Sequence, residues 1–454
     1  MNPLDDWLRR GVAAVGAWQS GFGGYREHPA QHVDPERFAA AFTEFTDRLG
    51  DNFPYFHPDY VGQMLKPPHP VAVAGYLTAM LINPNNHAAD SSPATSAMER
   101  EAIARLAAMF GFDTHLGHLT SSGTIANLEA LYVARESHPG KGIAFSADSH
   151  YTHGRMCHVL GMPGTTVPVD GRGRMDLDAL ERVLAGGTVG TVVLTAGTTG
   201  LGAIDPIHEA LALKERYGVR LHVDAAYGGF FSLLAQESSP ERIDPAPWRA
   251  IARCDSVVID PHKHGLQPYG CGAVLFADPS IARFYLHDSP YTYFTDAEFH
   301  LGEISLECSR AGAAAAALWL TLRVLPLTPD GLGRFLVASR RAALAWARTI
   351  ADSPHLELYQ EPELDIVTYF PAAATLSAVD AASAAVLAGG MKAASDPVFV
   401  SALKVDAAAF ARRHPRVPAD ADGARVLRSV LIKPEAETHL DRLRRIEHLA
   451  ARAG

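Results

Sequence analysis

Short apolar runs alternate with helical stretches between residues 86 and 325. The five runs are GIAFSAD (142–148), TVVLTAG (191–197), VRLHVDAA (219–226), SVVIDPH (256–262) and GAVLFAD (272–278). Continuous apolar runs of this length are typical of strands buried on both faces. The pattern predicts an α/β fold with a mostly parallel central sheet and helices on both sides.

The segments on either side differ from this central part. Pro, His and aromatic residues are frequent in the first 85 residues, as in FPYFHPDY and LKPPHP, and suggest an arm that wraps a partner. Beyond residue 325 we predict a helix over 331–352, strands in LDIVTYF, VFVSALKV and ARVLRSVLI, and a closing helix over 436–452. The predicted parts are an N-terminal segment (1–85), a large domain (86–325) and a small C-terminal α/β domain (326–454).

Composition and charge exclude several functions. The chain has 454 residues, a net charge of −10 and no clusters of Lys and Arg, which argues against a nucleic-acid partner. Its longest apolar run, AGAAAAALWLTL (311–322), is too short to span a membrane. The four cysteines form no CxxC pair and the N-terminus does not read as a signal peptide, so we expect a cytoplasmic protein.

Small hydroxyl residues and a glycine precede a predicted helix in LTSSGTIANLEALYVAR (119–135). A helix N-terminus offers free N–H groups and the positive end of the helix dipole, so Ser122, Gly123 and Thr124 are placed to hold a phosphate. The same residue types are also ordinary helix caps. In an open α/β sheet, ligands bind at the carboxyl ends of the strands, where further polar residues are found.

An acid, an imidazole and a lysine follow three of the predicted strands. Asp224 is either a helix cap or the partner of a protonated ring nitrogen, beside which Ala226 leaves room for the ring. His150, in SADSHYTHGRMCH, is well placed to lie over such a ring. Lys263, in DPHKHG, is either a solvated turn residue or a nucleophile whose pKa is lowered by burial and neighbouring cations.

Together these parts describe a site for pyridoxal phosphate, with a phosphate cradle, a stacking ring, a carboxylate for the ring nitrogen and a lysine able to form a Schiff base. Each feature has a simpler explanation alone, but their joint occurrence favours the cofactor. The alternative from another class is a metallohydrolase, with ligands from His150, His153, His158, His262 and His264. We predict no metal, because no acidic or cysteine partner stands at a recognised ligand spacing.

HVDAAYGGF (222–230) and DPHKHGLQPYGCGAVLF (260–276) resemble the group II pyridoxal-phosphate-dependent decarboxylases, most of all the bacterial tyrosine decarboxylases. NPNNHAADSSPATSAMER (83–100) and SLECSRAGAAAAALW (305–319) extend the resemblance, which runs from about residue 50 to 433. It implies the aspartate-aminotransferase-like fold (fold type I) and release of CO₂ from an L-amino acid. It also implies a homodimer with active sites at the interface.

The resemblance assigns roles to individual residues. Lys263 would carry the Schiff base, Asp224 would pair with the ring nitrogen and His150 would stack on the ring. The positions near the phosphate fall on Ser122, Gly123, Thr124 and His262, and Thr199 falls near the ring. Ala226, beside Asp224, completes the residues predicted for the cofactor.

Residues on the substrate side would decide what is decarboxylated. Arg310, in CSRAG, falls on the basic position expected to hold the substrate carboxylate, where the tyrosine enzymes tend to carry lysine. The donor of the proton to the carbanion is expected to be Tyr291, with Tyr293 as its competitor. Further substrate contacts are expected from Tyr269, His57 and His87.

We predict an aromatic L-amino acid as substrate, with tyrosine favoured, because Phe53, Tyr55 and Phe56 would line a pocket for its side chain. The nearby histidines would equally accept aspartate or glutamate. A further alternative keeps the cofactor but cleaves the Cα–Cβ bond, as in sphingosine phosphate lyase, which resembles this chain around the lysine. Release of CO₂ from a free amino acid distinguishes a decarboxylase from such a lyase.

Overall fold

The computed structural model describes residues 3–24, 26–286, 300–393 and 397–453. Its larger sheet consists of β1 (Leu116–Thr120), β2 (Gly142–Ser146), β3 (Gly164–Val167), β4 (Val189–Thr195), β5 (Arg220–Asp224), β6 (Ser256–Ile259) and β7 (Gly272–Phe276). The strands lie in the order β1-β7-β6-β5-β4-β2-β3, and among them β7 alone runs antiparallel to its neighbours. The predicted mostly parallel α/β sheet is confirmed, and all five apolar runs are strands; β1 and β3 are additional.

The middle of this sheet is buried on both faces. Every residue of β4, β6 and β7 is buried, as expected for strands that are covered by helices on both sides. Helix α5 (Gly123–Ser137) packs against β6 and β7, and α8 (Ile207–Tyr217) packs against β5. The other helices around this part are α4 (Pro93–Phe110), α6 (Thr152–Val159), α7 (Leu177–Ala185), α9 (Ala246–Ala250) and α10 (Gly312–Val324).

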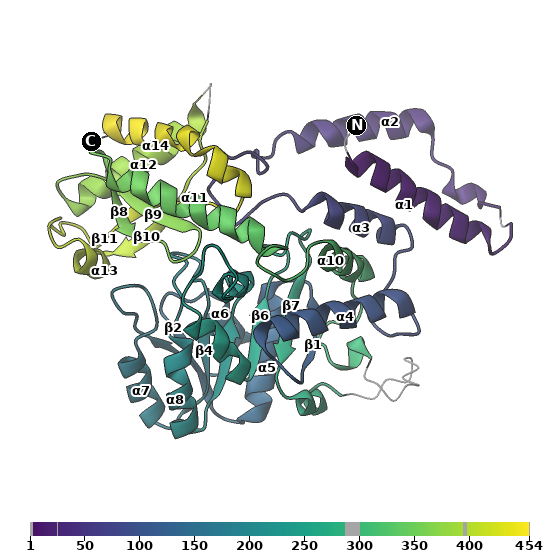
Figure 1. The fold of residues 1–454 in the computed structure, drawn as a ribbon, viewed down its shortest axis with the longest axis horizontal. Helices are drawn as coiled ribbons and strands as arrows, with labels where there is room; N and C mark the ends of the chain where they lie inside the picture. The colour runs from purple at the N-terminus through teal and green to yellow at the C-terminus, as the bar shows by residue number, and fades with distance from the viewer. Residues whose placement is uncertain (1–2, 25, 287–299, 394–396, 454) are drawn as a thin grey trace.

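A four-stranded antiparallel sheet lies beyond the large one (Figure 1). It is formed by β8 (Leu356–Gln360), β9 (Ile366–Pro371), β10 (Ser401–Asp406) and β11 (Gly423–Val430), in the order β10-β11-β9-β8. Its helices are α11 (Gly333–Ala351), α12 (Leu376–Lys392), α13 (Ala407–Arg413) and α14 (Leu440–Ala453). The three strands and two helices predicted for this segment are all present, and β8 is additional.

A buried carboxylate joins the two sheets. Asp365, directly before β9, is fully buried and accepts a hydrogen bond of 2.5 Å from the hydroxyl of Tyr227, which follows β5. The other carboxylate oxygen of Asp365 lies 3.3 Å from Nε2 of His264, in the β6–β7 connection. Apolar residues of both sheets, such as Val223 and Ile366, belong to one core cluster around this contact.

Two N-terminal helices project from the rest of the described chain (Figure 1). They are α1 (Pro3–Ser20) and α2 (Pro35–Leu49), and α3 (Pro70–Met80) leads back to the body. Asp34 caps α2 by accepting the backbone N–H of Arg37 at 2.9 Å. Apolar side chains at helical spacing remain exposed on α2: Phe38, Phe42, Phe45 and Leu49.

No helix in the described part of the chain has both the length and the apolar composition needed to cross a membrane.

Candidate active site

A cavity of about 220 Å³ lies at the carboxyl ends of β4, β5 and β6. Thr195 ends β4, Asp224 ends β5 and Asp260 follows β6, so three parallel strands each deliver a polar side chain to the lining. Every residue predicted for the cofactor lines this one cavity: Ser122, Gly123, Thr124, His150, Thr199, Asp224, Ala226, His262 and Lys263.

Lys263 lies in the connection between β6 and β7, next to a buried carboxylate. Its Nζ is 3.0 Å from Oδ2 of Asp260, and its side chain is 21% exposed. Burial opposes the charge of the amine, but Asp260, and to a smaller extent Asp224, outweigh it and hold the pKa of Lys263 above its ordinary value. The lowered pKa expected from the sequence is therefore wrong for this structure. The adjacent His262 adds no cation, because burial lowers its own pKa.

The backbone around Lys263 is tightly packed. Leu266 has a φ of 65°, in the left-handed region that residues other than glycine rarely adopt. A Cβ on Gly265 would lie 2.6 Å from Cα of Pro261, so a larger residue does not fit there. The side-chain amide of Gln267 donates to the carbonyl oxygen of Gly265 at 2.9 Å. The connection is a fixed platform for Lys263 and not a solvated turn.

Both carboxylate oxygens of Asp224 have a donor. Oδ2 lies 2.9 Å from Nε2 of His153, and Oδ1 accepts the backbone N–H of Ala226 at 3.1 Å. Burial would raise the pKa of this carboxyl group, but the hydrogen bond and charge of His153, with Lys263, hold the pKa of Asp224 well below its ordinary range. Asp224 is thus a buried carboxylate that stays ionised at neutral pH, as a partner for a protonated ring nitrogen must.

His150 forms part of the cavity wall. Its Nδ1 lies 2.8 Å from Oγ1 of Thr152, and its ring centroid is 4.3 Å from that of Tyr151. Burial, the largest influence, lowers the pKa of His150, so the imidazole is neutral at pH 7. Thr199 and Ala226 complete this part of the lining. A neutral, flat imidazole is suited to pack on a flat ring.

The N-terminus of α5 closes one side of the cavity. Oγ of Ser122 accepts the backbone N–H of Ile125 at 3.3 Å, and Gly123 and Thr124 begin the helix. A Cβ on Gly123 would lie 2.5 Å from Oδ2 of Asp260, so glycine allows α5 to begin beside the Lys263 connection. The helix end is placed to bind an anionic group of a ligand in the cavity.

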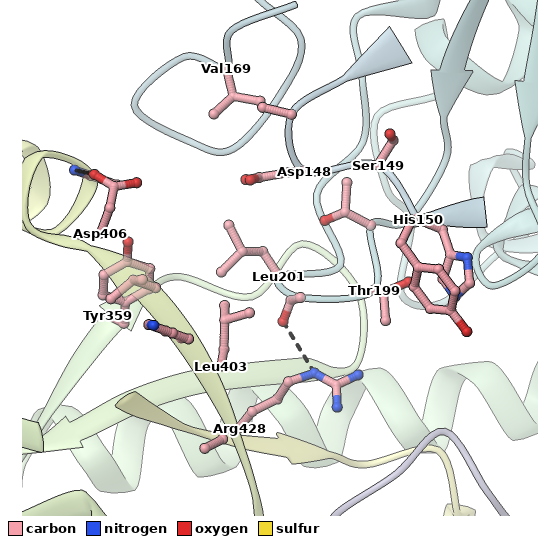
Figure 2. A pocket seen from close by; sticks show the side chains of 18 of the residues that line it. Asp148, Ser149, His150, Val169, Thr199, Leu201, Tyr359, Leu403, Asp406 and Arg428 are labelled. Atoms are coloured by element: carbon pink, nitrogen blue, oxygen red, sulfur yellow. Dashed lines mark hydrogen bonds between the residues drawn. The ribbon is translucent and has the colours of Figure 1, made fainter. Parts of the chain in front are cut away.

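A larger hollow of about 870 Å³ adjoins this cavity and reaches the four-stranded sheet (Figure 2). His150 and Thr199 line both spaces. Arg428, on β11, is 5% exposed and donates Nε to the Gly200 carbonyl at 3.2 Å and Nη1 to the Gly62 carbonyl at 3.3 Å. Its Nη2 has no hydrogen-bond partner among the described residues. A buried guanidinium with one open amino group is suited to bind a carboxylate.

Arg310 lines neither of these spaces. Its Nη1 lies 3.1 Å from Oε1 of Glu99 and also donates to the carbonyl oxygen of Leu119. Nη2 donates to the carbonyl oxygen of Asn86 at 3.4 Å. The role predicted for Arg310, holding the substrate carboxylate, has no support in this geometry, because the guanidinium is already bound to a carboxylate of the chain itself.

The other residues predicted for the substrate are not brought together within the described chain. Tyr269 is exposed, with its ring centroid 4.7 Å from that of His262. His57 is paired with Asp59 at 3.3 Å, and Nδ1 of His87 is 3.1 Å from a backbone carbonyl oxygen. Two further predicted residues lie outside the described residues: Tyr291 and Tyr293.

The histidines considered as metal ligands have separate partners. Those partners are Thr152 for His150, Asp224 for His153, the Cys271 carbonyl for His262 and Asp365 for His264. His158 is exposed on α6. In the described ranges, no group of three or more His, Cys, Asp or Glu side chains is arranged to hold a metal ion.

Three residues of the site have no role in the cofactor site predicted from the sequence: Asp260, Arg428 and His153, of which the sequence suggests His153 only as a metal ligand. Asp260 lies three positions before Lys263, with which it pairs, and His153 lies three positions after His150. Closeness in sequence to a predicted site residue could therefore have identified both. Arg428 interrupts the apolar strand ARVLRSVLI, and a charged residue within such a strand is the signal that could have identified it.

The family model "Pyridoxal-dependent decarboxylase conserved domain" matches residues 54–370. The L-tyrosine decarboxylase of Enterococcus faecium is 30% identical over an alignment of 380 residues, and the match covers 63% of this chain and 62% of that protein. The L-aspartate decarboxylase of Thermococcus kodakarensis is 27% identical over an alignment of 343 residues, and the match covers 74% of this chain and 86% of that protein. The chain therefore spans about six tenths of the length of the tyrosine decarboxylases that it matches.

Solved structures with the same fold cover nearly the whole chain. The crystal structure of Oryza sativa TDC with PLP and tryptamine has a TM-score of 0.79 and 17% sequence identity, and covers 100% of this chain and 99% of that chain. The crystal structure of mouse CSAD has a TM-score of 0.78 and 22% identity, and covers 93% of this chain and 90% of that chain. At these identities the likeness shows a shared fold.

Proposed function

The chain belongs to the pyridoxal-dependent decarboxylase family, and from this premise we propose that it uses pyridoxal phosphate to remove the carboxyl group of an L-amino acid as CO₂, leaving the amine. One observation carries the proposal. Lys263, Asp224 and His150 face the same cavity, beside the N-terminus of α5. An amine, a carboxylate, a flat ring and an anion site are the groups that this cofactor needs.

The residues present fit pyridoxal phosphate. Oγ1 of Thr195 and Oδ1 of Asp260 are buried in the lining without a hydrogen-bond partner among the described residues. Buried polar atoms are normally satisfied, so these two support a polar ligand in the cavity. The start of α5 would receive the phosphate, and Asp224 the ring nitrogen. Lys263 would hold the cofactor covalently.

The chain's own residues would then direct the chemistry. When bound, the cofactor supplies a ring that accepts the electron pair left by the departing carboxyl group. Asp224 would keep a proton on the ring nitrogen, because its carboxylate is ionised and fixed by two hydrogen bonds. His150 would cover one face of the ring and exclude water. Asp260 would hold the proton of the Lys263 amine when that amine is free.

We infer that Arg428, in place of Arg310, binds a carboxylate of the substrate. Its open Nη2 is buried, and the hollow that it lines also contains His150 and Thr199 of the cofactor cavity. Figure 2 shows the Arg428 side chain extending along the hollow toward the end where Thr199 and His150 lie. A carboxylate held there would lie next to the reacting centre.

We propose an aromatic L-amino acid as substrate, with tyrosine favoured. Val169, Leu201 and Leu403 give the hollow an apolar wall, and Tyr359 lies beside them (Figure 2). The similarity to a tyrosine decarboxylase supports this choice. Aspartate or glutamate is the second candidate, favoured by three further cations in the same lining, Lys404, Arg412 and Arg413.

We also propose a homodimer in which the N-terminal segment (1–85) covers a second copy of the chain. Phe42 and Phe45 of α2 are 52% and 54% exposed, and such an apolar face is suited to a protein partner. The same proposal divides the remainder into a large domain (86–325) and a small one (326–454), one for each sheet. A cytoplasmic location agrees with four free cysteines, three of them buried.

A panel of the twenty amino acids tests the proposed function. The full chain is loaded with pyridoxal phosphate, and CO₂ and the amine products are measured by mass spectrometry. We expect release of CO₂ and of one amine, with tyrosine giving tyramine. A yellow, cofactor-loaded chain that releases an aldehyde and no CO₂ would instead support carbon–carbon cleavage. A colourless chain inactivated by a chelator would support the metallohydrolase.

A further inference from the structure

Among the described residues, the side chain of His153 makes one hydrogen bond, and its partner is Asp224. The residue belongs to the first turn of α6 and is fully buried. Its Nε2 lies 2.9 Å from Oδ2 of Asp224, and its Nδ1 has no hydrogen-bond partner among the described residues. The ring otherwise lies near Phe145, with centroids 6.1 Å apart. The hydrogen bonding of a fully buried imidazole is therefore directed at a single carboxylate.

Few other groups stabilise the charge of Asp224. The Ala226 N–H contributes one hydrogen bond, and Lys263 attracts the carboxylate electrostatically. His222, two residues earlier on β5, directs both ring nitrogens to other side chains, and His150 is neutral because burial lowers its pKa. Burial itself disfavours the charged carboxylate.

The stabilisation of the Asp224 charge changes when Lys263 is bound to the cofactor. A lysine that holds a cofactor covalently is no longer a free ammonium, and the part of the stabilisation that it gave to Asp224 is altered. The contact with His153 does not depend on that amine. With a proton on Nε2, His153 donates to Oδ2 of Asp224, and this hydrogen bond also fixes the direction of the remaining carboxylate lone pairs.

We propose that His153 is a positioning residue that keeps Asp224 ionised and correctly oriented toward the ring nitrogen of the cofactor. The inference rests on the proposed function, because that function assigns Asp224 to the ring nitrogen. His153 does not line the cavity and acts through Asp224 alone. Protonation of the ring nitrogen then depends on the charge of Asp224, which the hydrogen bond from His153 stabilises.

The test uses the full chain and two replacements of His153. His153→Leu fills most of the space without a donor, and His153→Gln restores an N–H at a similar reach. For each variant we would measure the dissociation constant of pyridoxal phosphate and the pH at which the absorbance band of the bound cofactor changes. We expect His153→Leu to weaken cofactor binding about tenfold or more and to move the spectral transition down by about one pH unit. His153→Gln is expected to restore most of the cofactor affinity and to reverse most of the shift in the spectral transition.

His158→Gln is the matched control, because His158 is on the exposed side of the same helix. If His153→Leu does not fold, His153→Asn, which is polar but too short to reach Asp224, takes its place with the same expected shifts. Binding and a spectral transition like those of the unmodified chain, in whichever of these two variants folds, would overturn the inference. An unmodified chain that binds the cofactor but releases no CO₂ would overturn the proposed function and leave the role of His153 intact.

Discussion

The cavity around Lys263 and the cluster around Arg310 are both buried polar regions, but they satisfy their charges differently. In the cluster, Arg310 meets Glu99, and a histidine pairs with a second glutamate at 2.9 Å. In the described chain, polar atoms without a hydrogen-bond partner occur in both regions, on Arg428 beside the cavity and on Arg310 in the cluster. The difference is that the hydrogen-bond acceptors of Arg428 among the described residues are neutral oxygens, those of Gly200, Gly62 and Ser401. A charge that is paired within the chain fixes one conformation, whereas a buried charge without an opposite partner is suited to bind a charged ligand. Burial of a charge alone therefore does not identify a functional residue.

The largest effect is expected at Lys263, which defines the cavity region. Lys263→Ala should lower the turnover number about 10⁴-fold or more, because the nucleophile is lost, with little change in folding. CO₂ release and thermal unfolding measure the two effects. Lys263→Arg serves as a control, since it keeps a cation beside Asp260 without the nucleophile. Turnover within tenfold of the unmodified chain in either variant would remove Lys263 from the mechanism.

Arg310 tests the cluster side of the comparison. Arg310→Met leaves the buried Glu99 without its cationic partner and is expected to lower the free energy of unfolding by about 3–5 kcal/mol, measured by urea denaturation. The KM of the folded fraction should not change. Arg310→Met combined with Glu99→Gln should recover part of the lost stability. Normal stability with a raised KM would return Arg310 to the role that the sequence predicted.

Arg428 tests whether its open Nη2 meets the substrate. Arg428→Met removes a charge-assisted contact worth about 1.5–3 kcal/mol, so we expect KM to rise about 10- to 100-fold with a smaller change in turnover number. Initial rates over a range of substrate concentration give both constants. Arg428→Lys keeps the charge but not the planar guanidinium, so its KM should lie between those of the unmodified chain and of Arg428→Met. An unchanged KM in both variants would leave Arg428 a link between β11 and the loops that it contacts.

Acid should lower the free energy of unfolding, because histidines that are buried and neutral near the cavity are protonated when the chain unfolds. Burial lowers the pKa of His222 to about 3, and this residue lies on β5 two positions before Asp224. In the unfolded chain its pKa returns to about 6.5, so between these values the unfolded chain binds more protons, and stability falls as the pH falls. Through His222, the free energy of unfolding should fall by about 1 kcal/mol for each pH unit below 6. Urea unfolding at several pH values should show a shallower dependence in His222→Gln, and equal slopes would contradict this assignment.

The cavity around Lys263 could be predicted because its residues follow strands whose apolar runs are long. Asp224 ends β5 and Lys263 lies in the connection that follows β6, so the rule that parallel strands share one edge brings them together. The strands absent from the prediction have weak patterns. β1 contains a glycine and a histidine, and β3 is largely exposed. Neither reads as a buried apolar run.

The remainder of the site depends on tertiary packing. Arg428 reaches the hollow from β11, far along the chain, and no local pattern relates it to His150. Whether the pKa of Lys263 is raised or lowered depends on the balance between burial and the nearby Asp260, and this balance is set by the folded structure. The family resemblance placed Arg310 near the substrate, whereas its contact with Glu99 depends on helix α4 packing beside it.

The contact between Asp365 and the large sheet limits how the molecule can be recombined. Tyr227 and His264 each reach the same buried carboxylate from a different loop, and His264 is the residue next to Lys263. A chimera that takes its C-terminal third from a relative with an apolar residue at position 365 would leave a phenol hydroxyl and an imidazole without an acceptor. Exchange of such segments would require that all three positions be transferred together, so in a chimera the two sheets would have to be exchanged as one unit.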